Sequence, residues 1–219
     1  MRQDIELRLE TPKDYTEVEH ITREAFWNKH VPGCDEHYLA HVLRSSAAFV
    51  PELDFVAVHD GKVVGNIMYT KAVIRCDDGT EQNVLSFGPI SVLPLMQGQG
   101  VGSMLIRHTL ENAKEMGYTA VLIYGDPGYY SRFGFVSAEQ YGIGTSDDFY
   151  AEALQALELV PDALAKSAGK FFEDHAYEID EAAAAAFDKQ FLPKALRDDL
   201  PSQRHFKEML KARKPRTID

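Results

Sequence analysis

A predicted strand and a predicted helix meet in the segment Ser91-Val92-Leu93-Pro94-Leu95-Met96-Gln97-Gly98-Gln99-Gly100-Val101-Gly102-Ser103-Met104-Leu105. The apolar run over residues 83–92 favours a strand, and apolar residues at helical spacing favour a helix over residues 99–116. Glycine lets a backbone approach a ligand closely, and the first turn of a helix offers unpaired amide hydrogens at the positive end of its dipole. The segment therefore predicts a phosphate-binding loop.

Two better-known phosphate loops do not fit these glycines. A P-loop requires Gly-Lys-Ser/Thr, and this segment has no lysine; a Rossmann fingerprint spaces its glycines as Gly-x-Gly-x-x-Gly, which Gly98, Gly100 and Gly102 do not. An ordinary glycine-rich turn before a surface helix is the plain alternative. Gln97 and Pro94, together with the strand before them and the helix after them, favour phosphate binding.

The pattern Gln97-x-x-Gly100-x-Gly102, behind a Val-x-Pro step, resembles the pyrophosphate-binding signature of the GNAT superfamily of acyl-CoA N-acyltransferases. The resemblance covers about residues 4–160 and implies acetyl-CoA as co-substrate, with no metal. It implies that a backbone amide near a bulge in the fourth strand polarises the thioester carbonyl, at Ile90, Ser91 or Val92. It also implies that the pyrophosphate is held by Gln97, Gly98, Gln99, Gly100, Val101, Gly102 and Ser103.

A second motif follows the next apolar strand and reads Gly125-Asp-Pro-Gly-Tyr-Tyr-Ser-Arg-Phe-Gly-Phe135. It resembles the GNAT segment Tyr-x-x-x-Gly-Phe, with Tyr130 at the tyrosine position, and is closer still to a branch of predicted bacterial N-acetyltransferases with Asp-Pro-x-Tyr-Tyr-x-Arg-Phe-Gly-Phe. In that family the tyrosine is the usual general acid. A phenol of pKa ~10 can protonate a thiolate whose thiol has a pKa of ~8.5. The plainer alternative is that Tyr130 only packs against the sulfur or the core.

The general base that deprotonates the amine is left open. Some members of the resembling family use a glutamate on the fourth strand, where this chain has Val84. Glu81, Asp126 and His59 are candidate substitutes, acting directly or through water, although each also fits a solvated surface or turn position. Asp126 is the best placed of them because it lies just beyond the strand over residues 119–124.

Composition excludes several other classes of function. The formal net charge of the 219 residues is -11, with no long basic run, which argues against a nucleic-acid ligand. Cys34 and Cys76 lie far apart and outside both motifs, so neither a disulfide framework nor a thiol nucleophile is indicated. No run approaches the ~18 apolar residues of a membrane helix, and residues 1–5 lack a signal core. We therefore expect a cytoplasmic protein with no membrane partner.

The pattern along the chain predicts an α/β (α+β) fold, with a mixed, mainly antiparallel sheet flanked by helices. The resemblance to the GNAT superfamily implies that the fourth and fifth strands are splayed around the cofactor. A strand, a helix and an apolar strand over residues 83–124 predict a parallel pair joined by a right-handed crossover. Residues 150–159 favour a helix by local propensity and a strand by the resemblance, and we prefer the strand. Further strands are expected at 5–9, 55–58, 63–69 and 169–172, and further helices at 12–26 (N-cap Thr11, with Pro12 in the first turn), 35–43, 181–190 and 197–211.

The resemblance of the two motifs implies an N-acetyltransferase that moves an acetyl group from acetyl-CoA to a primary amine of a small molecule or peptide, by direct attack in a ternary complex. A non-catalytic acyl-CoA-binding or regulatory module, or an enzyme for a longer acyl-CoA, is the alternative. Residues 1–160 are expected to form the GNAT-like domain, and residues 161–219 an extension packed on it. We expect a monomer or homodimer. The basic residues 211–216 could contact acidic surface of the same chain or of a partner, and we prefer a solvated tail.

Overall fold

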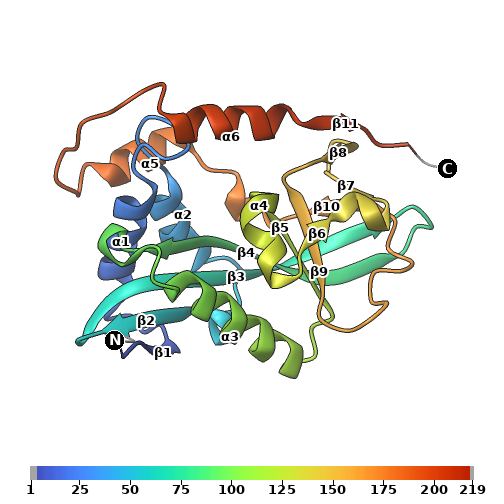
Figure 1. The fold of residues 1–219 in the computed structure, drawn as a ribbon, viewed down its shortest axis with the longest axis horizontal. Coiled ribbons are helices and arrows are strands. Elements are labelled where there is room, and N and C mark those ends of the chain that lie inside the picture. Colours follow the sequence, from blue (N-terminus) through green and yellow to red (C-terminus); the bar gives the residue numbers. More distant parts are fainter. Residues whose placement is uncertain (1–3, 218–219) are drawn as a thin grey trace. The chain divides into compact units, whose positions relative to one another are not determined.

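The computed structural model of the chain describes residues 4–217. Its α-helices are α1 (Tyr15–Phe26), α2 (Glu36–Leu43), α3 (Val101–Glu115), α4 (Pro127–Tyr130), α5 (Glu181–Asp188) and α6 (Pro201–Lys211). Its strands, labelled in Figure 1, are β1 (Glu6–Leu9), β2 (Phe55–His59), β3 (Lys62–Cys76), β4 (Glu81–Val92), β5 (Ala120–Tyr124), β6 (Val136–Ser137), β7 (Ile143–Gly144), β8 (Phe149–Ala151), β9 (Leu154–Glu158), β10 (Gly169–Phe172) and β11 (Arg213–Pro215).

One mixed sheet carries the strand order β1-β2-β3-β4-β5-β9-β6. The pairs β1–β2, β2–β3, β5–β9 and β6–β9 are antiparallel, whereas β4 and β5 run parallel on either side of α3 in the sequence. The predicted mixed, mainly antiparallel sheet and its parallel pair are thus confirmed. β9 pairs with all of β5, from Ala120↔Glu158 to Tyr124↔Leu154, so the strand preferred for this segment is also correct.

The chain forms two compact units, and β3, β4 and α3 each continue from one into the other. The first comprises the described residues up to Tyr69, with Gly88–Thr109 and His175–Arg204. The second comprises Thr70–Phe87, Leu110–Asp174 and the described residues from His205 on. The domain division at residue 160, expected from the sequence, stays a prediction.

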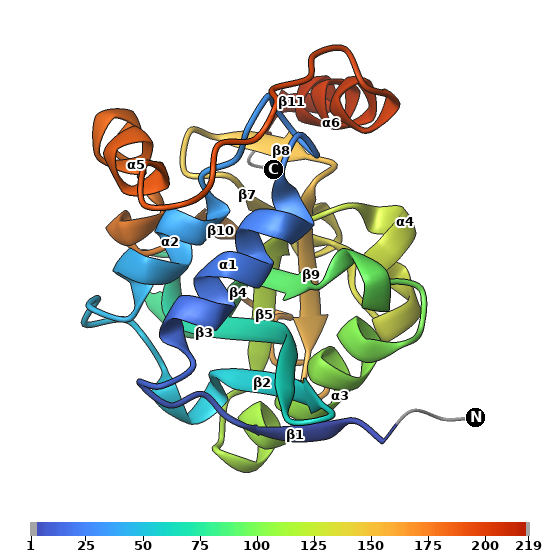
Figure 2. The ribbon, with the colours of Figure 1, turned by 90° about the vertical axis from the view of Figure 1, so that its left-hand side faces the viewer.

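In the first unit, α1 and α2 lie side by side over one face of the sheet (Figure 2). Their apolar residues form two clusters with β2 and β3, because each helix carries a buried stripe at helical spacing. α3 approaches the same strands closely at Gly65, where an added Cβ would lie 3.1 Å from the Ser91 carbonyl oxygen and 3.2 Å from the side chains of Val101 and Leu105. The clusters comprise Val18, Ile21, Val56, Val58 and Val63, and Ala40, Leu43 and Met68.

In the second unit, the C-terminal strands complete the sheet edges. β10 pairs antiparallel with β3, and β11 pairs antiparallel with β8. Arg216 donates to the carbonyl oxygen of Gly142 and forms an ion pair with Asp77. Residues 213–215 are exposed, but the expectation of a free tail is wrong, because β11 pairs with β8 and Arg213, Lys214 and Arg216 pair with acidic residues of the same chain.

Three helix starts differ from the sequence-based expectation. α1 begins at Tyr15 rather than Pro12, because residues 12–14 form a separate turn that the Asp14 amide closes on the Thr11 carbonyl oxygen at 2.8 Å. Asp14 is the N-cap residue, but its carboxylate accepts from the Thr11 amide and hydroxyl and from Arg8 and makes no capping bond to the helix. α3 begins at Val101, two residues later than expected, since Gly100 has a φ of 89° that a helix does not allow. α6 begins at Pro201 rather than residue 197, with proline in the first helical position.

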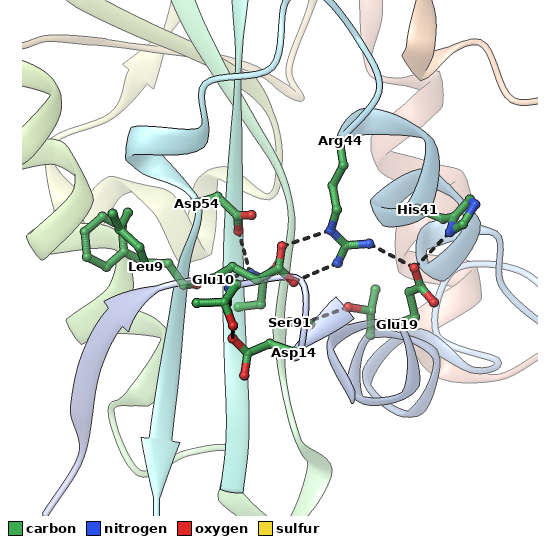
Figure 3. A network of polar contacts seen from close by, with 12 residues as sticks. Leu9, Glu10, Asp14, Glu19, His41, Arg44, Asp54 and Ser91 are labelled. Atoms are coloured by element: carbon green, nitrogen blue, oxygen red, sulfur yellow. Dashed lines mark hydrogen bonds and ion pairs between the residues drawn. The ribbon is translucent and has the colours of Figure 1, made fainter. Parts of the chain in front are cut away.

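A buried polar network holds the ends of α1, α2 and β1 together in the first unit (Figure 3). Arg44 donates two bonds to Glu10, at 2.7 and 2.9 Å, and a third to Glu19 at 2.9 Å. Asp54 accepts from Asn66 and lies against the carboxyl of Glu10. Burial, and next the hydrogen bond and charge of Glu10, raise the pKa of Asp54 well above its ordinary range.

We expect Asp54→Asn to flatten the dependence of stability on pH. The folded state holds a proton on Asp54 that the unfolded chain loses above about pH 3.9, so the free energy of unfolding falls as pH rises, by up to about 1.4 kcal/mol per pH unit. Chemical denaturation between about pH 5 and pH 8 measures that slope. Asp60→Asn, at an exposed hairpin carboxylate, is the control for removing one charge. An unchanged slope in Asp54→Asn would contradict the assignment.

Candidate functional site

The glycine segment lies in the first unit and joins β4 to α3. Gly98 and Gly100 have φ values of 72° and 89°, in the left-handed region that favours glycine. Gln97 Nε2 donates to the Val92 carbonyl oxygen at 3.0 Å, and Gln99 Nε2 donates to that of Leu95 at 2.8 Å. The two glutamine side chains thus brace the loop against its own backbone.

The loop is open on its outer side and anchored beneath. Residues 97–100 are exposed, whereas Val101 at the start of α3 is buried. A Cβ added at Gly98 or Gly100 would meet nothing within 4 Å, so a ligand has room to approach the backbone there. The Met104 amide makes the bond to the Gly100 carbonyl oxygen at 3.0 Å, and the earlier amides of the first turn lie at the positive end of the helix dipole. This arrangement fits a phosphate group.

The end of β4 leads into this loop. Ser91 is buried, and its Oγ accepts from the Thr22 hydroxyl of α1 at 3.0 Å. The Ser91 hydroxyl is therefore already hydrogen-bonded to α1. If Ile90, Ser91 or Val92 polarises a carbonyl, its backbone amide would do so. That role stays a prediction.

Tyr130 lies in the second unit, at the end of α4. Asp126 caps this short helix by accepting from the Gly128 amide at 2.8 Å. The half-buried Tyr130 ring packs against Phe87 of β4 and against Phe135, with ring centroids 5.9 and 5.8 Å apart. Burial raises the pKa of Tyr130, so the phenol keeps its proton at neutral pH.

Gly125 makes room for that ring. An added Cβ at this position would lie 2.3 Å from Cε2 of Tyr130, closer than any unstrained contact. Tyr130 can therefore fold back over the end of β5 only because residue 125 has no side chain. The glycine is visible in the sequence, but its purpose appears only when the ring is placed.

The candidate bases proposed from the sequence are all engaged elsewhere. Glu81 is exposed at the start of β4 and pairs with Arg75 at 3.3 Å. Asp126 pairs with His205 at 2.8 Å, and that hydrogen bond, together with the Gly128 amide, lowers its pKa. His59 ends β2 beside Asp60. Another carboxylate, which the sequence analysis did not single out, is that of Glu173; it follows β10 and accepts from Ser86 of β4 at 3.0 Å.

One buried group of side chains has the thiol–imidazole–carboxylate arrangement of a cysteine-nucleophile triad: Cys34, His37 and Asp188. The Cys34 Sγ lies 3.6 Å from His37 Nδ1, and His37 Nε2 lies 3.1 Å from Asp188. Both the thiol and the imidazole are buried, and burial raises the pKa of Cys34. Arg23 Nε also donates a hydrogen bond to the Asp188 carboxylate at 2.6 Å. The group therefore packs α1, α2 and α5 together and supplies no thiolate.

Residues 4–217 lack two features that would indicate other kinds of site. No group of three or more His, Cys, Asp or Glu side chains there is arranged to bind a metal ion. None of the helices in the same range is long and apolar enough to cross a lipid bilayer.

Comparison with known proteins identifies the family. The family model described as an acetyltransferase (GNAT) domain matches residues 6–138, more than half of the chain. The chain therefore belongs to the GNAT acetyltransferase family, as the two sequence motifs implied. The uncharacterised N-acetyltransferase YhbS of Escherichia coli K12 is 30% identical over 159 residues, which cover 72% of this chain and 89% of YhbS.

Solved structures agree with this assignment. The crystal structure of E. coli YhbS in complex with CoA has a TM-score of 0.69 and 27% identity, over 81% of this chain and 93% of that one. A GNAT family acetyltransferase from Brucella melitensis in complex with acetyl-CoA has a TM-score of 0.64 and 30% identity, over 80% of this chain and 99% of that one. The fold and the enzyme class are thus established.

Proposed function

We propose that this protein transfers an acetyl group from acetyl-CoA to a primary amine of a small molecule or peptide, by direct attack in a ternary complex. The observation that carries the proposal is the open loop of positive-φ glycines at the start of α3. Two relatives of known structure, bound to CoA and to acetyl-CoA, support the choice of donor.

The glycine segment would hold the donor. The amides of the first turn of α3, with the backbone at Gly98 and Gly100, would bind the pyrophosphate, each charged hydrogen bond contributing about 1.5–3 kcal/mol. A backbone amide among Ile90, Ser91 and Val92 would stabilise negative charge on the thioester oxygen. These contacts depend on backbone position, so the glutamine braces and the anchored Val101 matter more than side-chain charge.

Tyr130 would serve the leaving group. When the C–N bond forms and the C–S bond breaks, the departing thiolate needs a proton, and the Tyr130 phenol would give it one. The burial that raises the pKa of Tyr130 keeps that proton in place before the reaction. Cys34 is buried as a neutral thiol, which supports direct attack by the amine rather than an acyl-cysteine intermediate.

Calorimetry with acetyl-CoA, followed by an assay of thiol release, tests the proposal. Acetyl-, butyryl- and palmitoyl-CoA serve as donors, and spermidine, an aminoglycoside, lysine and a short peptide as acceptors. We expect acetyl-CoA to bind and thiol release to require one of the amines. Binding without turnover on any amine would indicate a binding module, and preference for palmitoyl-CoA would overturn the acetyl assignment. No binding at all would refute the phosphate-loop interpretation.

A further inference from the structure

We propose that Glu173 is the general base that takes the proton from the acceptor amine. The inference rests on the proposed function, and concerns a residue in the second unit that lies beyond the segment matched by the family model. The Glu173 carboxylate contacts β4, the strand that also contacts Tyr130.

The pairing of β10 with β3 positions Glu173 beside β4. The pairing of Phe172 with Val73 and of Phe171 with Ile74 fixes β10 against β3, so the following residue lies at the end of that pairing. The half-buried Glu173 carboxylate accepts from the Ser86 hydroxyl at 3.0 Å, and Ser86 itself is fully buried. A carboxylate from the C-terminal part of the chain is thereby held at a fixed point on the central strand.

That point lies directly after the register pair that joins β4 to β5. The two strands pair at Leu85↔Val121, and Ser86 and Phe87 directly follow this pair. Successive side chains of a strand point to opposite faces, so Ser86 and Phe87 face opposite sides of the sheet. Glu173 contacts the first and Tyr130 the second. The carboxylate and the phenol therefore approach consecutive residues of β4 from opposite faces.

Opposite faces suit the two proton transfers of the reaction. Glu173 takes one proton from the substrate ammonium, and the neutral nitrogen then forms the C–N bond. As the C–S bond breaks, Tyr130 gives its proton to the thiolate. The nitrogen loses its second proton, which restores the phenol, and Glu173 releases the first to solvent. The sum is one amide, one thiol and one proton.

The surroundings of Glu173 suit a base at neutral pH. Burial raises its pKa to about 7, against a smaller opposite effect of the Ser86 hydroxyl. Tyr124 of β5 faces it, and after burial it is the charge of Glu173 that most raises the pKa of Tyr124. Asp147 raises and Arg213 lowers the pKa of the same tyrosine. A base of pKa near the working pH combines a populated carboxylate with a useful proton affinity.

Glu173→Gln tests the assignment, with Glu152→Gln at an exposed position of the same unit as matched control. The probe is whichever amine of the spermidine, aminoglycoside, lysine and peptide panel the wild type acetylates. We expect kcat/KM for the amine to fall about 10²-fold or more at neutral pH, with acetyl-CoA affinity unchanged. The deficit should shrink at high pH, where the free amine is deprotonated without help. A constant deficit across pH would indicate a merely structural role and overturn the proposal.

A direct titration keeps the test independent of the acceptor. In 13C NMR of labelled glutamate side chains, the signal absent from Glu173→Gln should titrate near pH 7 in the wild type. Ser86→Ala should move that midpoint to higher pH, since it removes the hydroxyl that lowers the pKa. A midpoint near the ordinary value of about 4.3 would overturn the proposal.

The two proposals fail in different ways. If acetyl-CoA does not bind to the wild type, the proposed function is wrong. If the wild type and Glu173→Gln acetylate the amine equally well, only the assignment of the base is wrong.

Discussion

Replacing Tyr130 by phenylalanine is expected to lower kcat about 10²-fold or more, because the leaving thiolate loses its proton donor. The ring contacts with Phe87 and Phe135 need no hydroxyl, so the fold and the affinity for acetyl-CoA should be preserved. Steady-state kinetics of thiol release, with calorimetry of acetyl-CoA binding, separates the two quantities.

Tyr129→Phe is the matched control for this experiment. Tyr129 lies beside Tyr130 on α4, with the ring centroids 5.0 Å apart, and has no role in the proposed reaction. We expect it to keep nearly the wild-type rate. Equal rates for wild type and Tyr130→Phe would remove the general-acid role and leave the ring as packing.

A second large effect is expected from Gly100→Trp, which should weaken acetyl-CoA binding by at least about 10²-fold. The indole would fill the open space above the loop and prevent the backbone from approaching the pyrophosphate. Loss of two charged hydrogen bonds at about 1.5–3 kcal/mol each exceeds the ~2.7 kcal/mol that a 10²-fold change requires. Calorimetric titration of wild type and variant with acetyl-CoA measures the difference.

Gly100→Ala separates bulk from backbone strain. Both substitutions place a Cβ at a φ of 89°, at a cost of roughly 1–2 kcal/mol, but only tryptophan adds bulk over the loop. We expect the alanine variant to bind acetyl-CoA more tightly than the tryptophan variant at similar thermal stability. If Gly100→Trp bound acetyl-CoA with wild-type affinity, the loop would be an ordinary turn between β4 and α3 that does not bind the pyrophosphate.

The sequence predicted best what is local. The glycines before α3, the strands expected at 55–58 and 63–69 and the apolar run of β5 each depend on their own backbone or pattern, and all were placed correctly. β9 was a harder case, since its alanine, glutamate and leucine residues favour a helix in isolation. Pairing along the whole of β5 overrides that propensity, because the strand buries Leu154 and Ala156 in the core of the second unit.

Contacts between distant segments explain the rest. Glu173 reaches Ser86 across 87 residues, and nothing next to either residue in the sequence predicts that the two meet. The basic end looked like a tail because β8, the strand with which it pairs, has only three residues and lies more than sixty residues earlier in the sequence. Glu81 and Asp126 were chosen as candidate bases from their positions in the sequence. Their ion pairs with Arg75 and His205 form only in the folded chain, so the sequence did not predict them.

Gly125 offers a criterion for judging other members of the family. Its missing side chain is what permits the Tyr130 ring to lie back over β5, so the two positions form a pair five residues apart. A homologue that keeps the tyrosine but carries a larger residue at the earlier position must move the ring. An alignment alone would then assign the general-acid role to a tyrosine whose ring lies elsewhere. The residue at the glycine position should therefore be checked before the role is assigned.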